Sequence, residues 1–76
     1  MTVNDAIRAI RRASGKSQQL FSTELGISLR TFARYEHKQI PEPRQLGILL
    51  KYARQNKHSR AVDVFKKALQ KAIYDE

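Results

Sequence analysis

Arg30 and Arg34 are the side chains whose type and spacing suggest chemistry in this sequence. They follow Gly26 within the segment GISLRTFARYE. A guanidinium group combines a permanent positive charge with a planar fork of donors, and it binds two acceptor atoms at once on a phosphate or on the edge of a guanine. Residues four apart lie on the same face of a helix. The pair therefore predicts a helical surface that binds anions or base edges.

Capping residues and a glycine divide the surrounding sequence into two short helices. Ser17 can cap a helix over 18–25, Gly26 ends it, and Ser28 can cap a second helix over 29–37. The apolar residues at helical spacing are Phe21, Leu25, Phe32 and Tyr35, with Ile27 in the turn. This spacing is that of a helix-turn-helix, although an ordinary helical hairpin in a small bundle shares it.

The rest of the chain is also patterned as helices, over 3–14, about 43–55 and about 60–74. Thr2 with Asp5 is a start signal for the first, and Gly15 is a stop signal. The segment IPEP, 40–43, interrupts helical structure, and Ser59 can cap the last helix. No long stretch alternates with a period of two. The sequence predicts one all-α domain with five helices over the whole chain.

The charge balance favours a polyanionic partner. The chain has 76 residues, with 15 Lys and Arg against 7 Asp and Glu, which gives a formal net charge of +8. Nucleic acid is the first expectation for this balance, and an anionic membrane surface is the second. Without cysteine there is no disulfide framework. No apolar run approaches the roughly 18 residues of a membrane span, and no signal peptide is evident, so we expect a cytoplasmic, nucleoid-associated protein.

The segment 10–41 resembles the phage-repressor, Cro-like (XRE) helix-turn-helix family. The matching residues are Ile10, Arg11, Gly15, Ser17, Gln18, Phe21, Ser22, Leu25, Gly26, Ile27, Ser28, Phe32, Arg34, Tyr35 and Glu36. The sequence departs from the family at Lys16, where leucine is usual, at Ser22, where alanine is preferred, and at Lys38, where glycine is common. The resemblance implies a five-helix lambda-repressor-like fold with the helix-turn-helix at about 17–37.

Four residues are expected to face DNA bases from the helix over 29–37. Helical geometry places Leu29, Arg30, Ala33 and Arg34 on an outward arc, and the resemblance points to the same four positions. The arginine forks suit guanine, and the apolar side chains suit a thymine methyl group. Arg30 could instead hold only a phosphate.

A second set of residues is expected to bind phosphates, which position a protein without specifying a sequence. It comprises Lys16, Ser17, Gln18, Thr31, His37, Lys38, Gln39 and Arg44. Gln18 stands in the first turn of a helix, where the positive helix end and a side-chain amide can meet one phosphate, and the family uses its matching glutamine in this way. Lys16 and Arg44 could equally be solvated surface residues.

Arg11 and Glu36 are expected to be structural. The resemblance implies an ion pair between them that joins the first helix to the end of the third. The alternative is two exposed, unpaired charges.

Nothing in the sequence indicates catalysis, a metal or a cofactor. His37 and His58 lack partners at metal-ligand spacing, and no nucleophile, base and orienting acid form a recognisable set. We expect neither an enzyme nor a small-molecule ligand.

The last helix is expected to serve both the core and a dimer. One helix in one groove reads only about four or five base pairs, too few for specificity in a genome, whereas a two-fold dimer doubles the readout. Val62, Phe65 and Leu69 are assigned mainly to the core, and Val64, Ala68, Ile73 and Tyr74 to the partner face.

The sequence therefore predicts a transcription regulator that binds a palindromic double-stranded DNA operator as a homodimer, and that represses by blocking polymerase. One alternative is an antitoxin-type protein-binding module of the same fold, which also binds its own promoter. The others are an amphipathic basic membrane peptide and, less favoured by helix-in-groove readout, an RNA-binding protein.

Overall fold

The computed structural model describes the backbone of residues 1–74 and the side chains of residues 1–72. Every regular element in that part of the chain is an α-helix. The helices are α1 (Val3–Ser14), α2 (Gln18–Leu25), α3 (Leu29–His37), α4 (Pro43–Gln55) and α5 (Ser59–Tyr74). The chain is all-α, as predicted, and the bounds of the first four helices agree with those expected from the sequence.

The N-terminal ends of α1, α2 and α3 are closed by the residues that the sequence indicated. The Asp5 backbone N–H donates to the Thr2 hydroxyl at 3.0 Å, and the Thr2 N–H donates to the Asp5 carboxylate at 3.1 Å, which makes a reciprocal capping box on α1. The hydroxyl oxygens of Ser17 and Ser28 each accept a backbone N–H three residues later and so cap α2 and α3. Gly15 closes α1 with a left-handed backbone, at φ 73°. These caps explain why local signals were sufficient to place the helices.

The start of α5 corrects one expectation. Ser59 was expected to cap this helix, but it is the first helical residue, and His58 accepts the first helical bond from the Val62 N–H at 2.9 Å. The reason lies in the connection from α4. The His58 N–H donates back to the Ala53 carbonyl at 2.9 Å, and Lys57 adopts a left-handed φ of 58°. The backbone therefore reverses direction at Lys57 and His58, and the helix begins at Ser59.

All five helices contribute to one core. Phe21, Phe32 and Phe65 are completely buried, while Val62 and Leu69 are half-buried against the core. The remaining buried apolar residues are Ala6, Ile7, Ile10, Ile27, Tyr35, Leu46, Leu49, Leu50, Ala53 and Ala61. Of the three α5 residues assigned to the core from the sequence, Phe65 is buried and the other two are half-buried against it, while Ala61 of α5 is buried as well.

An aromatic cluster fixes α2 and α3 against α4. The ring of Phe21 lies 5.6 Å from that of Phe32 and 5.0 Å from that of Tyr52, measured between centroids, and the second contact is edge-to-face at 82°. Aromatic pairs in this geometry contribute stability in addition to that from burying their apolar area. Ser22, which follows Phe21 in α2, is also buried. The α2–α3 pair is therefore held to the rest of the protein as a unit.

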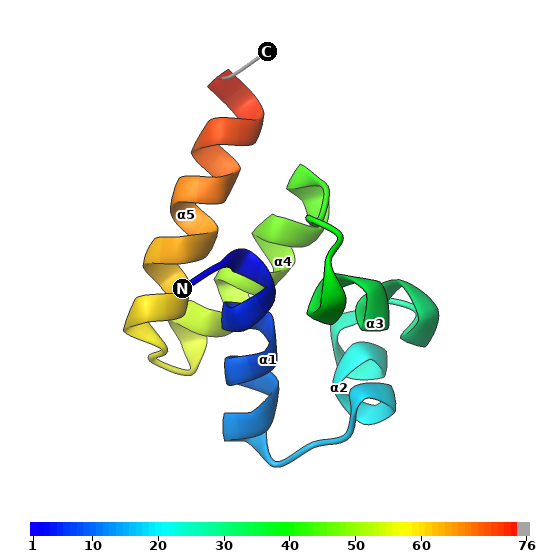
Figure 1. Cartoon of the computed structure of the whole chain (residues 1–76). Coiled ribbons are helices and arrows are strands. Elements are labelled where there is room, and N and C mark those ends of the chain that lie inside the picture. The colour runs from blue at the N-terminus through cyan, green and yellow to red at the C-terminus, as the bar shows by residue number, and fades with distance from the viewer. Residues whose placement is uncertain (75–76) are drawn as a thin grey trace.

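The arrangement separates two faces of the molecule. Helix α1 contacts both α3 and α5, α2 packs on α3, and α4 packs on α5. In Figure 1, α2 and α3 lie on one side of α1, and α5 lies on the other. None of the described helices carries an apolar stretch long enough to cross a bilayer. Because α3 and α5 lie on opposite sides of α1, their outer surfaces belong to different faces of the molecule.

Candidate nucleic-acid interface

A tight turn sets the direction in which α3 leaves α2. Gly26 has a φ of 73°, a left-handed conformation that side chains other than glycine rarely adopt. Ile27 follows; its N–H donates to the Ser22 carbonyl at 2.9 Å, and its side chain is buried. Ser28 then caps α3 by accepting from the Thr31 N–H at 3.2 Å. The buried Ile27 side chain anchors this turn, so the first residues of α3 have a fixed orientation.

The outward face of α3 carries the four residues expected to read bases. Arg30 and Arg34 are exposed, Leu29 is 43% exposed, and Ala33 is half-buried. The opposite face, which packs inward, consists of Phe32, Tyr35 and Glu36. The helical arc expected from the sequence is therefore present, with Ala33 at its edge.

The two arginines on this face have no protein partner within the described part of the chain. Neither Arg30 nor Arg34 donates a side-chain hydrogen bond or forms an ion pair with residues 1–72. By contrast, Arg8 and Arg11 are both engaged with acidic side chains. Two unengaged guanidinium forks one helical turn apart make this surface suited to binding an external anion or base edge.

A buried carboxylate joins three helices behind this face. Glu36 is only 5% exposed, and its oxygens accept from Arg11 Nε at 2.5 Å, from Arg11 Nη2 at 3.3 Å and from Gln18 Nε2 at 2.6 Å. Arg11 also donates to the Lys16 carbonyl at 3.0 Å, which fixes the loop between α1 and α2. The Arg11–Glu36 ion pair is therefore present and structural in position. A charge buried in this way requires its partners, because an unpaired one is costly.

Gln18 has a contact that the sequence did not indicate. Its amide nitrogen was expected to meet a phosphate, and in the structure it donates to Glu36. An amide nitrogen carries two hydrogens, so one remains for a second acceptor. Ser17 is comparable, because its hydroxyl oxygen accepts from the Leu20 N–H at 3.1 Å and its own hydrogen remains able to donate. Glu36 thus orients the Gln18 amide at the positive end of α2.

The other expected phosphate ligands fall into two groups. Lys16 is half-buried and pairs with Glu24 at 2.5 Å, and this hydrogen bond raises the pKa of the Lys16 ammonium group. The Thr31 hydroxyl accepts from the Ser28 hydroxyl at 2.9 Å. His37, Lys38, Gln39 and Arg44 are exposed. The charge of Lys16 is therefore already compensated within the protein, whereas the side chains of the four exposed residues face solvent.

Asn4 and Arg8 of α1, which were not among the expected site residues, hold the end of α3. Asn4 donates through Nδ2 to the Tyr35 carbonyl at 2.6 Å and to the Gln39 carbonyl at 3.0 Å. Arg8 donates to the Glu36 backbone carbonyl and also pairs with Asp5. Carbonyls at a helix C-terminus lack partners in their own helix, and a cation there is favourable. Asn4, Arg8 and Arg11 form a row of hydrogen-bond donors along α1, and this row was the sequence signal that could have indicated these contacts.

The residues expected at a dimer face are described only in part. Val64 and Ala68 are half-buried, and both pack against the core. They also line a groove beside Met1 and Val3. The side chains of Ile73 and Tyr74 lie outside the described residues.

The described side chains do not cluster in a way that suits a metal ion. Within this part of the chain, no group of three or more His, Cys, Asp or Glu residues is close enough together to act as ligands.

No protein-family model matches the chain, and neither does any curated protein or solved structure compared with it. The outward face of α3 and the Glu36 network are the features from which a function can be inferred.

Proposed function

We propose that this chain is a helix-turn-helix protein of lambda-repressor-like fold that binds double-stranded DNA through α3. Three observations support the proposal. Helix α2, the turn at Gly26 and helix α3 have the lengths of such a unit. Arg30 and Arg34 extend from the exposed face of α3 without a protein partner among the described residues. The formal net charge of +8 favours a polyanion.

Sequence would be read by the outward face of α3 in the major groove. The groove is about 12 Å wide and accepts one helix, and each base pair presents a distinct pattern of donors and acceptors there. Arg30 and Arg34 would each bond the O6 and N7 atoms of a guanine. Leu29 and Ala33 would contact thymine methyl groups. Two forks one turn apart would therefore select guanines a few base pairs apart in each half-site.

Phosphate contacts would set the position of α3 along the duplex. The N-terminus of α2 carries partial positive charge, and Gln18 and Ser17 each retain a hydrogen to donate. The C-terminus of α3 lies beside this end of α2, because Gln18 bonds to Glu36, and both His37 in the last turn of α3 and Lys38 after it are exposed. Glu36 lies between these ends and holds α2 to α3. Base contacts and phosphate contacts would consequently occur in one fixed register.

Two copies would bind one operator. A single α3 reads about four or five base pairs, which is too few against the competing sites of a genome. A two-fold pair would read two half-sites about 34 Å apart, so the operator would be a palindrome. A bound pair over a promoter would exclude polymerase, and repression is the regulation that we propose.

The observation that carries this proposal is the pair Arg30 and Arg34 on an exposed helical face, with no partner among the residues that the structure describes. The test is selection of bound duplexes from a random DNA pool, followed by sequencing. We expect a palindrome with guanines at symmetric positions. Recovery of unrelated sequences, or no retention of any duplex at low ionic strength, would reject the proposal. Ultracentrifugation of the protein with one selected duplex would give the number of copies bound.

A further inference from the structure

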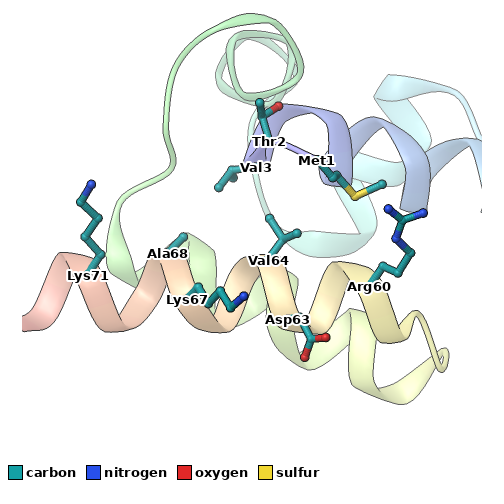
Figure 2. Close-up of a pocket in the computed structure, with 9 residues that line it drawn as sticks. All are labelled: Met1, Thr2, Val3, Arg60, Asp63, Val64, Lys67, Ala68 and Lys71. Carbon is teal, nitrogen blue, oxygen red and sulfur yellow. The ribbon is translucent and has the colours of Figure 1, made fainter.

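A groove lies between the start of α1 and the outer face of α5. It has a volume of about 560 Å³. The apolar residues that line it come from both segments: Met1 and Val3 from the start of the chain, and Val64 and Ala68 from α5. In Figure 2, the Val64 side chain points toward Met1 and Val3, across the groove. Met1 is 57% exposed, and the other three apolar residues are half-buried, so part of this apolar floor is accessible to a partner.

Cations flank this apolar floor along α5. Arg60, Lys67 and Lys71 line the groove and are exposed. At 100° per residue their spacings of seven and eleven place them in one row, with Val64 and Ala68 in the next row. The row spans about 16 Å at 1.5 Å per residue. Among the described residues that line this groove, Asp63 is the one acid, and its carboxylate points away from α1 in Figure 2.

The charge of the groove selects among possible occupants. A second copy of this chain, which was expected from the sequence against Val64 and Ala68, would bring a formal net charge of +8 toward a cationic row and would be repelled at this groove. A nucleic-acid backbone would be attracted by the cations but has no apolar group to place on Val64 and Ala68. An acidic amphipathic peptide meets both requirements, because its apolar side chains would cover the floor while its carboxylates face the row.

We propose that this groove is a docking site for an acidic, amphipathic segment of a different protein. Apolar side chains of that segment contact Met1, Val64 and Ala68, and its Asp or Glu residues pair with Lys67 and Lys71. The proposal is independent of DNA binding. Because α3 and α5 lie on different sides of α1 (Figure 1), a docked partner leaves the outward face of α3 uncovered. The chain can therefore hold a protein and a polyanion at the same time.

The experiment is selection of peptides from a random 12-residue library displayed on phage, using the folded full chain as bait. The groove variant is Lys67→Glu with Lys71→Glu. The matched control is Lys51→Glu with Lys66→Glu, which changes the net charge equally at exposed positions outside the groove. Circular dichroism verifies that both variants fold. The most enriched peptide is then synthesised, and its binding is measured by fluorescence anisotropy and mapped by amide chemical shifts.

We expect enriched peptides in which acidic residues surround apolar ones. Their affinity should fall at least tenfold for the groove variant and less than threefold for the control, with the largest shifts at Val3, Val64 and Ala68. The proposal is overturned if no peptide is enriched, if the enriched peptides lack acidic residues, or if both variants lose affinity equally, which would indicate bulk charge. It is also overturned if Val64→Arg converts a dimer into a monomer in ultracentrifugation, because the occupant would then be a second copy.

Discussion

The Gln18 amide donates a 2.6 Å hydrogen bond to the Glu36 carboxylate, which joins the first residue of α2 to the last turn of α3. The turn at Gly26 connects the opposite ends of the same two helices. Each helix is therefore held to the other at two points along its length. Arg11 adds a link to α1 through the same carboxylate. The orientation of the exposed face of α3 consequently depends on one buried group that does not belong to that face.

Removing Arg11 should destabilise the protein strongly. In Arg11→Ala, Glu36, which is 5% exposed in the wild type, would lose its charged partner. Breaking a buried ion pair from one side costs about 3 to 5 kcal/mol. We expect a loss of that size in the free energy of unfolding, measured by urea denaturation.

Glu24→Gln is the control for this measurement. It breaks the pair between Lys16 and Glu24, whose side chains are 35% and 44% exposed, against 19% and 5% for Arg11 and Glu36. An exposed pair contributes about 0 to 1 kcal/mol. If Arg11→Ala cost no more than Glu24→Gln, the Glu36 network would not be the structural join inferred from its geometry.

Replacing Arg34 should weaken binding to a selected DNA in a sequence-dependent way. Loss of one bidentate guanine contact costs about 1 to 3 kcal/mol and relaxes selectivity at one position in each half-site. Fluorescence anisotropy with the selected duplex and with single-base variants measures both effects. Arg54→Ala removes an exposed charge from α4 and should leave the preference among bases unchanged. Equal weakening on every duplex would show that Arg34 contacts phosphate only.

The two glycines Gly26 and Gly47 should respond to alanine in opposite directions. An added Cβ meets no atom within 4 Å at either position. At Gly26 the left-handed φ of 73° remains costly for alanine, by about 1 to 2 kcal/mol. Gly47 lies inside α4, where alanine is about 1 kcal/mol more favourable than glycine. Thermal unfolding should show a lower Tm for Gly26→Ala and a higher Tm for Gly47→Ala, and a rise for both would contradict the strain at the turn.

Stability should decrease in acid through Asp5. Hydrogen bonding by Thr2, first through its backbone N–H, lowers the pKa of the Asp5 carboxyl below its ordinary value of 3.8. A carboxyl with a lowered folded-state pKa contributes stability above its unfolded pKa, and this contribution is lost as the pH falls through the folded value. Wild type should therefore be more stable than Asp5→Asn at pH 7, and the difference should shrink below pH 3.8. Urea unfolding of both proteins between pH 7 and pH 2 measures it; a constant difference would rule out the linkage.

Local signals in the sequence were sufficient to predict the helices. Thr2, Ser17 and Ser28 accept hydrogen bonds from backbone groups within three residues, and Gly15 and Gly26 close helices through their own backbone conformation. Because the two partners of each such interaction are close in the sequence, the sequence itself indicates where the helix begins or ends. Ser59 is the exception, because its place depends on how the preceding turn folds back onto α4.

The tertiary contacts of the site were harder to predict. Asn4 and Arg8 bond to carbonyl groups, and every residue carries one, so no sequence pattern identifies the acceptor. Gln18 was expected to point outward, and the structure shows that the carboxylate it meets is 18 residues away. The position of Met1 against α5 likewise depends on how α1 packs, and that packing places Val64 in a groove.

The lack of protein partners for Arg30 and Arg34 among the described residues has a consequence for divergence. Substitutions at these two positions disturb neither the core nor the Glu36 network. On the proposed function, the DNA sequence preferred by this face can therefore change without loss of folding, so that one scaffold would serve proteins with different target sites.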